Sequence, residues 1–505
     1  MLILEGFLVT KQGEFILREN ACQNLWAGIL IAAILLFIAT AFNSGIDDPD
    51  TWWHLATGKY IVQTRSVPHS DPFSWTVAGK PWVTHEWLAE VLLYLAYAAG
   101  QFWGVLSFLL AVASVLFLLY WRLLTTAKGP FFVAALVLLI TGEMLYPFLE
   151  LRPQVFSYVL CVAFLYLLHC YEQGKNRLFL LPLLTVLWAN SHGSFFLGPV
   201  FLFLYICCGL VPFRYEKLVN RRLDKMALAR LFLVMVLCIA AAALNPNGGK
   251  LLVYPFTTLD ASGMMNNIQE WLSPDFHNPY NQLFLVYYLG TFLLLLLTPQ
   301  RIRLFDLVLF LLCGAAAFTH ARFIAYALLV NGILWANYYR PALRWKTQLK
   351  GAVKYALLPA LLALYAVILA GRMPPQDPVD YRFADPQEYP VKALAYLKEH
   401  PLKGKMLNYY GWGGYLIWNR AGEKVFIDGR ADVYLPKVFD DYRRITHLAP
   451  EAPALLEAYG IDYVFMPAAA ALVQALRFSP DWETYYADQT AVILVKKKGG
   501  ASRAR

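Results

Sequence analysis

Long apolar runs separated by short polar segments make up most of the chain before residue 372. Runs of about 17 to 20 apolar residues are long enough to cross the hydrocarbon core of a bilayer as helices. The pattern predicts about eleven such helices, of which the first is expected to be an uncleaved anchor. They fall at 25–42, 102–121, 131–148, 155–171, 178–189, 195–211, 231–244, 283–298, 304–318, 323–339 and 355–370. The chain is therefore predicted to be a polytopic α-helical membrane protein.

The apolar segment 87–99 is too short to be assigned in the same way. Its aromatic and aliphatic side chains fit a helix that rests on the outer leaflet of the membrane. The alternative is a further span, which would change the number of crossings. Sequence alone leaves both interpretations open.

The pattern changes after residue 372, where Pro374, Pro375 and Pro378 indicate a linker. Short β-type runs then alternate with helical ones, and none is long enough to span a membrane. The β-type runs are 405–409, 424–427, 463–466 and 491–495, and the helical runs are 389–399, 435–445, 452–459 and 468–476. We therefore expect two domains: a transmembrane domain at 1–372 with a large outer loop at 43–101, and an extracytoplasmic α/β domain at 373–505.

Composition and charge support this view. Of 505 residues, 59% are hydrophobic and 15% are charged, which excludes a water-soluble globule. The net charge of +9 would suggest a nucleic-acid partner in a soluble protein. Here the basic residues gather in alternate short loops, as the positive-inside rule predicts, so no nucleic-acid partner is expected. These loops are 122–128, 175–177, 214–230, 301–303 and 340–354.

The same loops predict the orientation. The N-terminus is expected to be cytoplasmic, and the intervening loops and the C-terminal domain extracytoplasmic. The seven cysteines lie in or beside apolar runs, so neither a disulfide framework nor a thiolate zinc site is expected. Because the C-terminal domain has no cysteine, a bacterial inner (plasma) membrane is the favoured location.

Three carboxylates lie within four positions of the first outer loop: Asp47, Asp48 and Asp50. One aspartate could cap the helix that follows, but capping does not need three. The cluster therefore predicts a catalytic carboxylate that acts as general base on an acceptor, or a ligand of a divalent cation such as Mg²⁺ or Mn²⁺. Capping alone is the alternative.

The same loop continues with His54, His85 and Glu86, which suit a site for an acceptor or a sugar. Other outer loops add polar residues where predicted spans end. Ionisable groups at membrane depth usually face a cavity or a partner. These residues are Glu150, Arg152, His192, Glu270, His320 and Arg322.

The two arginines, Arg152 and Arg322, are expected to hold the phosphate of a lipid-linked donor, because a guanidinium matches the geometry of an oxyanion. The two histidines, His192 and His320, are assigned to the same phosphate site. The alternatives are that the arginines extend to the lipid headgroups and that the histidines are buried in the core with their hydrogen bonds made there. With Asp48, the acids Glu150 and Glu270 permit a metal ion without requiring one.

Absent motifs narrow the function further. The sequence has no phosphate loop ending in Gly-Lys-Ser/Thr, no His-Glu-x-x-His helix and no Gly-x-Ser-x-Gly elbow. Their absence argues against ATP-driven transport, zinc-dependent hydrolysis by a His-Glu-x-x-His helix, and hydrolysis by a serine nucleophile on a Gly-x-Ser-x-Gly turn.

The arrangement resembles the GT-C superfamily of glycosyltransferases, which are integral membrane enzymes that use polyprenyl-phosphate-linked sugars. Members place an essential acidic motif just after the first span, where Asp47, Asp48 and Asp50 lie here. Several also carry a soluble C-terminal domain on the outer face.

Segments 405–418 and 426–432 are similar to the region around the Trp-Trp-Asp motif of oligosaccharyltransferase catalytic subunits. The second Trp of that motif falls near Trp412, but Gly413 replaces the acid. Segment 267–270, Asn-Ile-Gln-Glu, partly matches a Thr-Ile-x-Glu sequence of the same family. The resemblance implies that Asp48 is the leading catalytic acid, Glu270 a metal or acceptor ligand, and Arg322 a contact of the donor phosphate.

The sequence thus predicts a membrane glycosyltransferase that moves a sugar or glycan from a polyprenyl-(pyro)phosphate donor to a protein, lipid or glycan acceptor at the extracytoplasmic face. The alternative is a transporter or flippase of a lipid-linked or anionic substrate, although no internal repeat is found. A third possibility is that the aromatic residues around Trp412 bind glycan by stacking. The alternative is that they pack in the core of the C-terminal domain.

Overall fold

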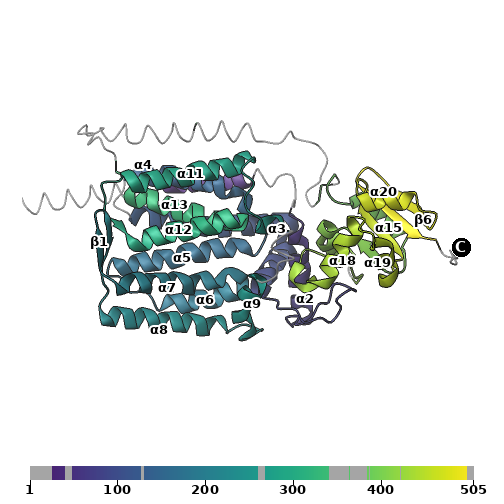
Figure 1. Cartoon of the computed structure of the whole chain (residues 1–505), viewed down its shortest axis with the longest axis horizontal. Coiled ribbons are helices and arrows are strands. Elements are labelled where there is room, and N and C mark those ends of the chain that lie inside the picture. Colours follow the sequence, from purple (N-terminus) through teal and green to yellow (C-terminus); the bar gives the residue numbers. More distant parts are fainter. Residues whose placement is uncertain are drawn as a thin grey trace, which may run out of the picture.

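A computed structural model describes residues 25–39, 48–126, 130–259, 268–340, 363, 384–385, 387–420 and 422–497. A bundle of helices and a smaller α/β domain lie end to end (Figure 1). Asp47 and, apart from Ala363, the predicted span at 355–370 lie outside the described residues.

Among the described residues, the bundle contains the helix Leu25–Ala39 and ten further helices. These are α3 (Trp87–Thr126), α4 (Phe131–Leu145), α5 (Gln154–Glu172), α6 (Leu180–Ser191), α7 (Leu197–Leu210), α8 (Lys225–Ala242), α9 (Lys250–Leu259), α11 (Pro279–Leu297), α12 (Leu304–Thr319) and α13 (Ile324–Tyr338). Short 3₁₀ turns extend or connect them: η2 (Tyr146–Phe148), η3 (Gly193–Phe196), η4 (Gln269–Trp271) and η5 (Ala321–Phe323).

Within the described part of the chain, six helical segments are long and apolar enough to cross a membrane. They are Trp87–Thr126, Phe131–Phe148, Gln154–Glu172, Gly193–Leu210, Lys225–Ala242 and Pro279–Leu297. The expected number of about eleven is not confirmed. The predicted spans at 178–189, 304–318 and 323–339 form the shorter helices α6, α12 and α13, of 12, 16 and 15 residues. Helices α6 and α12 end where polar residues begin, at His192 and His320.

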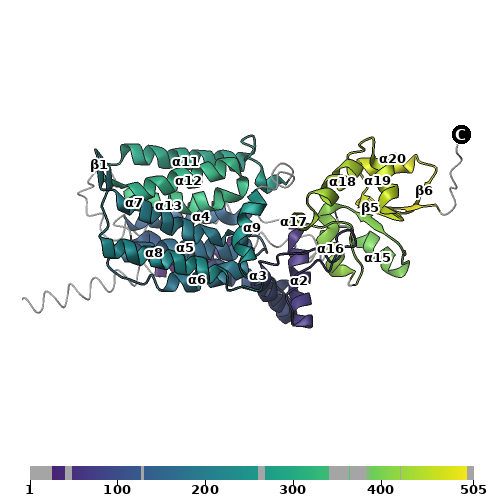
Figure 2. The same ribbon diagram turned by 60° about the horizontal axis from the view of Figure 1, so that its bottom comes forward.

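Helix α3 is broken at Gly100 and Gln101, whose φ/ψ angles of −155°/20° and 51°/−133° are not helical. The break separates segment 87–99 from the part that begins near residue 102. Gly104 allows the two parts to pack closely, because a Cβ there would lie 2.0 Å from the Ala96 carbonyl oxygen. The first part packs against α2 (Asp50–Thr64). Figure 2 shows α2 beyond the end of the bundle, next to the C-terminal domain.

The C-terminal domain is built on a four-stranded sheet with the order β4-β5-β7-β6. Its strands are β4 (Met406–Asn408), β5 (Tyr463–Pro467), β6 (Trp482–Ala487) and β7 (Ala491–Lys496). Strands β4 and β5 are parallel, and β7 runs antiparallel to β5 and β6. The helices are α15 (Val391–Glu399), α16 (Gly413–Asn419), α17 (Ala431–Tyr434), α18 (Lys437–Thr446), α19 (Ala452–Tyr459) and α20 (Ala471–Arg477), with the 3₁₀ turn η6 (Tyr410–Trp412).

Three of the four expected strands appear as β4, β5 and β7. The run 424–427 does not form a strand of this sheet. Instead Val425 makes a single parallel bridge to Ser74 in the first outer loop. The edge strand β6 was not expected, because most of its residues are not buried and its apolar pattern is weak.

A second small sheet lies at the far end of the bundle from the C-terminal domain (Figure 1). It consists of β1 (Phe213–Tyr215), β2 (Leu218–Asn220) and β3 (Ile302–Arg303). These strands belong to basic loops that the sequence places on the cytoplasmic side. The two ends of the molecule thus carry the segments for which opposite membrane sides are predicted.

Candidate active site

A cavity of about 710 Å³ lies where the bundle, α2, the first outer loop and the C-terminal domain meet. Most of the candidate residues from separate outer loops line it. These are Asp50, His54, His85, Glu86, Glu150, Arg152, His192, Glu270 and Arg322. The topology therefore brings together polar residues that are far apart in the sequence.

Arg152 lies in the loop before α5 and is surrounded by carboxylates. Its Nε and Nη2 donate to the two carboxylate oxygens of Asp48. Its Nη1 is 3.3 Å from Asp50 Oδ2 and 3.5 Å from Glu270 Oε2. Its Nε is also 3.2 Å from Glu150 Oε2. One guanidinium therefore serves four acids, and the group carries an excess of negative charge when all are ionised.

Arg322 supplies a second guanidinium next to this group. Its Nη1 is 3.5 Å from Glu270 Oε1, so Glu270 lies between the two arginines. Its guanidinium carbon lies 4.1 Å from the centre of the Trp271 ring, a cation–π contact. The η4 and η5 turns that carry these residues are joined by the Ala321 N–H, which donates to the Leu272 carbonyl at 2.9 Å. Arg322 thus lies over an aromatic ring at the cavity wall.

Burial and charge give these carboxyl groups different protonation behaviour. Burial raises the pKa of Asp50 to about 7, with Arg152 opposing and Asp48 reinforcing the rise. Burial likewise raises the pKa of Glu150 to about 8, again against the effect of Arg152. Burial also acts to raise the pKa of Glu270, but Arg322 and Arg152 outweigh it and hold that pKa below its ordinary value. The cavity therefore combines an ionised carboxylate with two that titrate near neutral pH.

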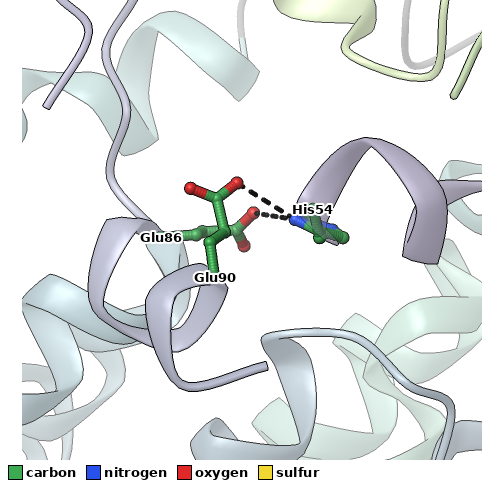
Figure 3. A group of neighbouring side chains, drawn as sticks. All are labelled: His54, Glu86 and Glu90. Atoms are coloured by element: carbon green, nitrogen blue, oxygen red, sulfur yellow. Dashed lines mark hydrogen bonds and ion pairs between the residues drawn. The ribbon is translucent and has the colours of Figure 1, made fainter. Parts of the chain in front are cut away.

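A second cluster, made of His54, Glu86 and Glu90, also lines the cavity (Figure 3). His54 Nδ1 of α2 is 3.1 Å from Glu90 Oε1 and 3.9 Å from Glu86 Oε2. The two helices approach closely here because Gly58 lies against the backbone of Glu90, where a Cβ would be 2.1 Å from the carbonyl oxygen. Burial lowers the pKa of His54, and the positive charge of Arg152 lowers it further, so the imidazole is neutral at pH 7.

The C-terminal domain closes the cavity through its segment 410–432. A Cβ on Gly429 would lie 1.9 Å from Asp50 Oδ1, and one on Gly414 would lie 2.8 Å from the Pro49 carbonyl oxygen. Only glycine permits such close approach of one backbone to another element. Tyr410 and Asp432 also line the cavity, and the Asp432 carboxylate accepts a hydrogen bond from Tyr254 of α9 at 3.3 Å.

Arg430 joins the C-terminal domain to the first outer loop. It pairs with Asp428 at 2.6 Å and with Asp71 of the outer loop at 2.8 Å, and all three side chains are almost fully buried. Its guanidinium also lies over the Trp82 ring at 4.6 Å. Lys80 adds hydrogen bonds to the backbone carbonyls of Val433 and Leu435.

Three candidate residues are placed away from the cavity lining. Asp48 lies behind Arg152 and also accepts the Asp50 N–H at 3.0 Å, a local bond at the start of α2. His320 packs against Trp271 and bonds to its carbonyl, so it supports the ring on which Arg322 lies. Trp412 is buried in the C-terminal domain, where its N–H donates to the Glu388 carbonyl at 2.8 Å. Its position is that of a core residue, because no part of it faces the cavity.

Four further residues that line the cavity were not predicted from the sequence: Glu90, Trp271, Arg430 and Asp432. Glu90 could have been found as a lone carboxylate inside the apolar segment 87–99. Arg430 and Asp432 lie within the segment 426–432 whose resemblance to oligosaccharyltransferases was noted.

The expected metal-ligand set of Asp48, Glu150 and Glu270 surrounds the Arg152 guanidinium. The positive charge among these acids is therefore supplied by the protein itself. In the described part of the chain, the one group of three whose ligand atoms all lie within 4.8 Å of one another is His54, Glu86 and Glu90.

No protein-family model matches the chain, and no curated protein matches it. Solved structures, in contrast, do match it. The oligosaccharyltransferase of Archaeoglobus fulgidus, tethered to an acceptor peptide containing the NVT sequon, matches with a TM-score of 0.58 at 12% identity, over 94% of this chain and 74% of that one. The chain has an oligosaccharyltransferase-like GT-C fold.

Two further solved structures from A. fulgidus agree on the fold. AglB of A. fulgidus in complex with an inhibitory peptide and a dolichol-phosphate matches with a TM-score of 0.58 at 11% identity, over 95% of this chain and 75% of that one. The A. fulgidus oligosaccharyltransferase in complex with Zn and sulfate matches with a TM-score of 0.53 at 14% identity, over 92% and 73%. The GT-C resemblance inferred from the sequence is thus confirmed at the level of fold.

Proposed function

We propose that the protein is a membrane glycosyltransferase that transfers a sugar or glycan from a polyprenyl-(pyro)phosphate donor to an acceptor at the extracytoplasmic face. The observation that carries the proposal is the cavity itself. It places Arg152 and Arg322 beside Asp50, Glu150 and Glu270, between the end of an apolar bundle and an α/β domain. A lipid-linked phosphate has its charged group at this depth and its chain in the bilayer.

The two guanidiniums are suited to bind the donor phosphate and to stabilise its charge as it leaves. Arg322 is the better placed, because it has a longer ion pair and an aromatic support, whereas Arg152 is engaged by Asp48 in a two-point contact. Both arginines lie within ion-pair distance of Glu270, so a phosphate entering the cavity would compete with that carboxylate for them.

Asp50 is the carboxylate we assign to the acceptor. It lines the cavity, and its pKa of about 7 lets it take a proton near neutral pH. In the proposed step an acceptor O–H or N–H attacks the anomeric carbon, the bond from that carbon to the phosphate oxygen breaks, and the proton passes to Asp50. The phosphate leaves with the bonding electron pair, held by the arginines. Asp48 keeps Arg152 oriented.

Two observations on the neighbours support this proposal. The A. fulgidus enzyme was solved with an acceptor peptide and with a dolichol-phosphate, which are an acceptor and a lipid phosphate. We extend the lipid phosphate to this chain, and we place the cavity on the extracytoplasmic side from the distribution of the basic loops. The C-terminal domain has no cysteine, which favours a bacterial inner membrane. The acceptor is a protein, lipid or glycan that offers a hydroxyl or amide.

The test uses the full-length protein in detergent with radiolabelled sugars on polyprenyl phosphate and on polyprenyl pyrophosphate. We expect one donor class to be consumed, and D50N to lower turnover at least a hundredfold. The control is D275N, which changes an exposed aspartate outside the cavity. Full turnover by D50N would remove Asp50 from the mechanism, and no consumption of either donor would contradict the proposal. The competing transporter or flippase would leave the donor intact, because detergent removes the two sides that transport needs.

A further inference from the structure

We propose that His54, Glu86 and Glu90 form a binding site for a divalent transition-metal cation of the zinc class, separate from the arginine–carboxylate group. This inference does not depend on the proposed transfer reaction.

The spacing of the ligand atoms fits a metal ion. Zinc bonds of about 2.0 to 2.2 Å in a tetrahedral arrangement place neighbouring ligand atoms about 3.3 to 3.6 Å apart. His54 Nδ1 lies 3.1 Å from Glu90 Oε1 and 3.9 Å from Glu86 Oε2. Figure 3 shows both carboxylates directed at the imidazole from the opposite side of the gap. Small movements of the three side chains would place their ligand atoms around one cation.

The cluster is also incomplete without a ligand. Glu90 is 1% exposed, and its Oε2 has no hydrogen-bond partner within the described residues. A buried carboxylate oxygen without a partner costs free energy, so it calls for a cation or a donor. His54 is 3% exposed, which leaves bulk water little access to the pair. The unpaired oxygen is an observation independent of the spacing.

Two further histidines, His192 and His85, lie against Glu86, one of the proposed ligands. The His192 Nδ1 accepts the Ser194 N–H at 3.2 Å, so the neutral ring carries its proton on Nε2, which lies 3.5 Å from Glu86 Oε1. His192 can therefore hold Glu86 in place from outside, as second-layer partners of metal ligands do.

His85 also contacts Glu86. Its Nδ1 donates to the Val83 carbonyl, which can only accept, at 3.1 Å. Its Nε2 lies 3.7 Å from Glu86 Oε1. Gly193 keeps the space beside it open, since a Cβ there would lie 3.1 Å from His85 Nε2. His85 therefore contacts Glu86 but is not one of the three residues whose ligand atoms all lie within 4.8 Å of one another.

The donor set indicates which cation binds. An imidazole nitrogen combined with carboxylate oxygens suits Zn²⁺ and similar transition metals, whereas Mg²⁺ and Ca²⁺ prefer oxygen ligands alone. The charges of the two carboxylates, of which Glu90 is buried, would also be neutralised by a double positive charge. Any ligand position left open would face the cavity that all three residues line.

The test measures metal binding directly, without any sugar donor. The full-length protein, purified without a histidine tag, is treated with a chelator, passed through a desalting column and titrated with ZnSO₄. Bound zinc is counted by elemental analysis and its affinity by calorimetry. In parallel, Co²⁺ is added alone, and its visible d–d absorption reports the coordination geometry. We expect one equivalent of zinc, a four-coordinate cobalt spectrum, and no displacement by excess Mg²⁺.

The variants E90Q and H54Q, on different helices, should each weaken zinc binding at least tenfold. The variant H277A is the matched control, because it removes a fully exposed histidine beside a carboxylate and should bind zinc as the wild type does. Circular dichroism and gel filtration check that the variants fold. Absence of bound zinc in the wild type, or wild-type affinity in folded E90Q or H54Q, would overturn the inference. Because no donor is used, either result is distinct from failure of the glycosyl-transfer assay.

Discussion

Gly429 of the C-terminal domain lies against Asp50 of α2 so closely that a Cβ on the glycine would be 1.9 Å from the Asp50 Oδ1. The same Asp50 oxygen accepts the Trp53 indole N–H at 3.0 Å. The orientation of the carboxylate in the cavity is therefore set by two different domains.

The variant G429A should move Asp50 and lower kcat at least tenfold, because catalysis is sensitive to displacements of about 1 Å. Its melting temperature should change much less than its activity. The matched control is G249A, at a glycine where an added Cβ meets no atom within 4 Å. Equal turnover by G429A and the wild type would show that the position of Asp50 does not matter for the reaction.

Removing Arg430 should destabilise the protein strongly. The variant R430M leaves Asp71 and Asp428 buried without their counter-charge, which costs about 3–5 kcal/mol. Thermal unfolding followed by fluorescence measures the effect. The control R443M changes an exposed arginine of the same domain and should be nearly neutral. Similar melting temperatures for the two variants would argue against the bridge between the domains.

The pH dependence of stability follows from the raised pKa of Glu150, about 8 in the folded protein against 4.5 ordinarily. A carboxyl whose pKa rises on folding contributes stability that is complete below pH 4.5 and is lost as the pH rises through 8. We therefore expect the melting temperature to fall between pH 6 and pH 9, and to fall less in E150Q. Parallel curves for the two proteins would contradict this origin of the pH dependence.

The rate of the proposed transfer should rise with pH through about 7, because Asp50 accepts the proton only when ionised. A plot of kcat/KM against pH for the free enzyme measures this ionisation. The variant D48N should shift the curve to lower pH, since Asp48 is one of the charges that raise the pKa of Asp50. A flat profile between pH 5 and pH 9 would exclude Asp50 as the base.

Arg322 should act mainly on the donor. The variant R322K keeps the charge but loses the planar fork and the stacking on Trp271, so KM for the donor should rise about tenfold or more. The control R340K changes an arginine at the end of α13, where it contacts the Tyr339 carbonyl. An unchanged KM in R322K would show that the donor phosphate is bound elsewhere.

The sequence predicted the overall division into a membrane domain and an α/β domain, because long apolar runs and short alternating ones are distinct patterns. The lengths of the membrane helices were predicted less well. Helices α6 and α12 stop at Ser191 and Thr319, where the chain turns to place polar residues near the cavity. Such an end depends on tertiary contacts, which hydropathy does not record.

The candidate site was predicted in part for a similar physical reason. Charged residues at the ends of apolar runs are costly in lipid and usually face a polar cavity. Arg152, Glu270 and Arg322 were therefore predicted as site residues from their positions in the sequence, and all three line the cavity. Trp412 was assigned by resemblance, and an aromatic residue in a core looks the same in sequence as one in a binding site. Arg430 was missed because its role depends on the pairing with Asp71, which only the folded chain brings into contact.

The approach of Gly429 to Asp50 also has a consequence for biosynthesis. Asp50 is translated early and Gly429 near the end. When only the apolar helices have been synthesised, the cavity therefore still lacks one of its walls. Nascent chains can therefore insert into lipid before the cavity is complete, and the proposed transfer would begin only when the last domain has been synthesised and has folded onto α2.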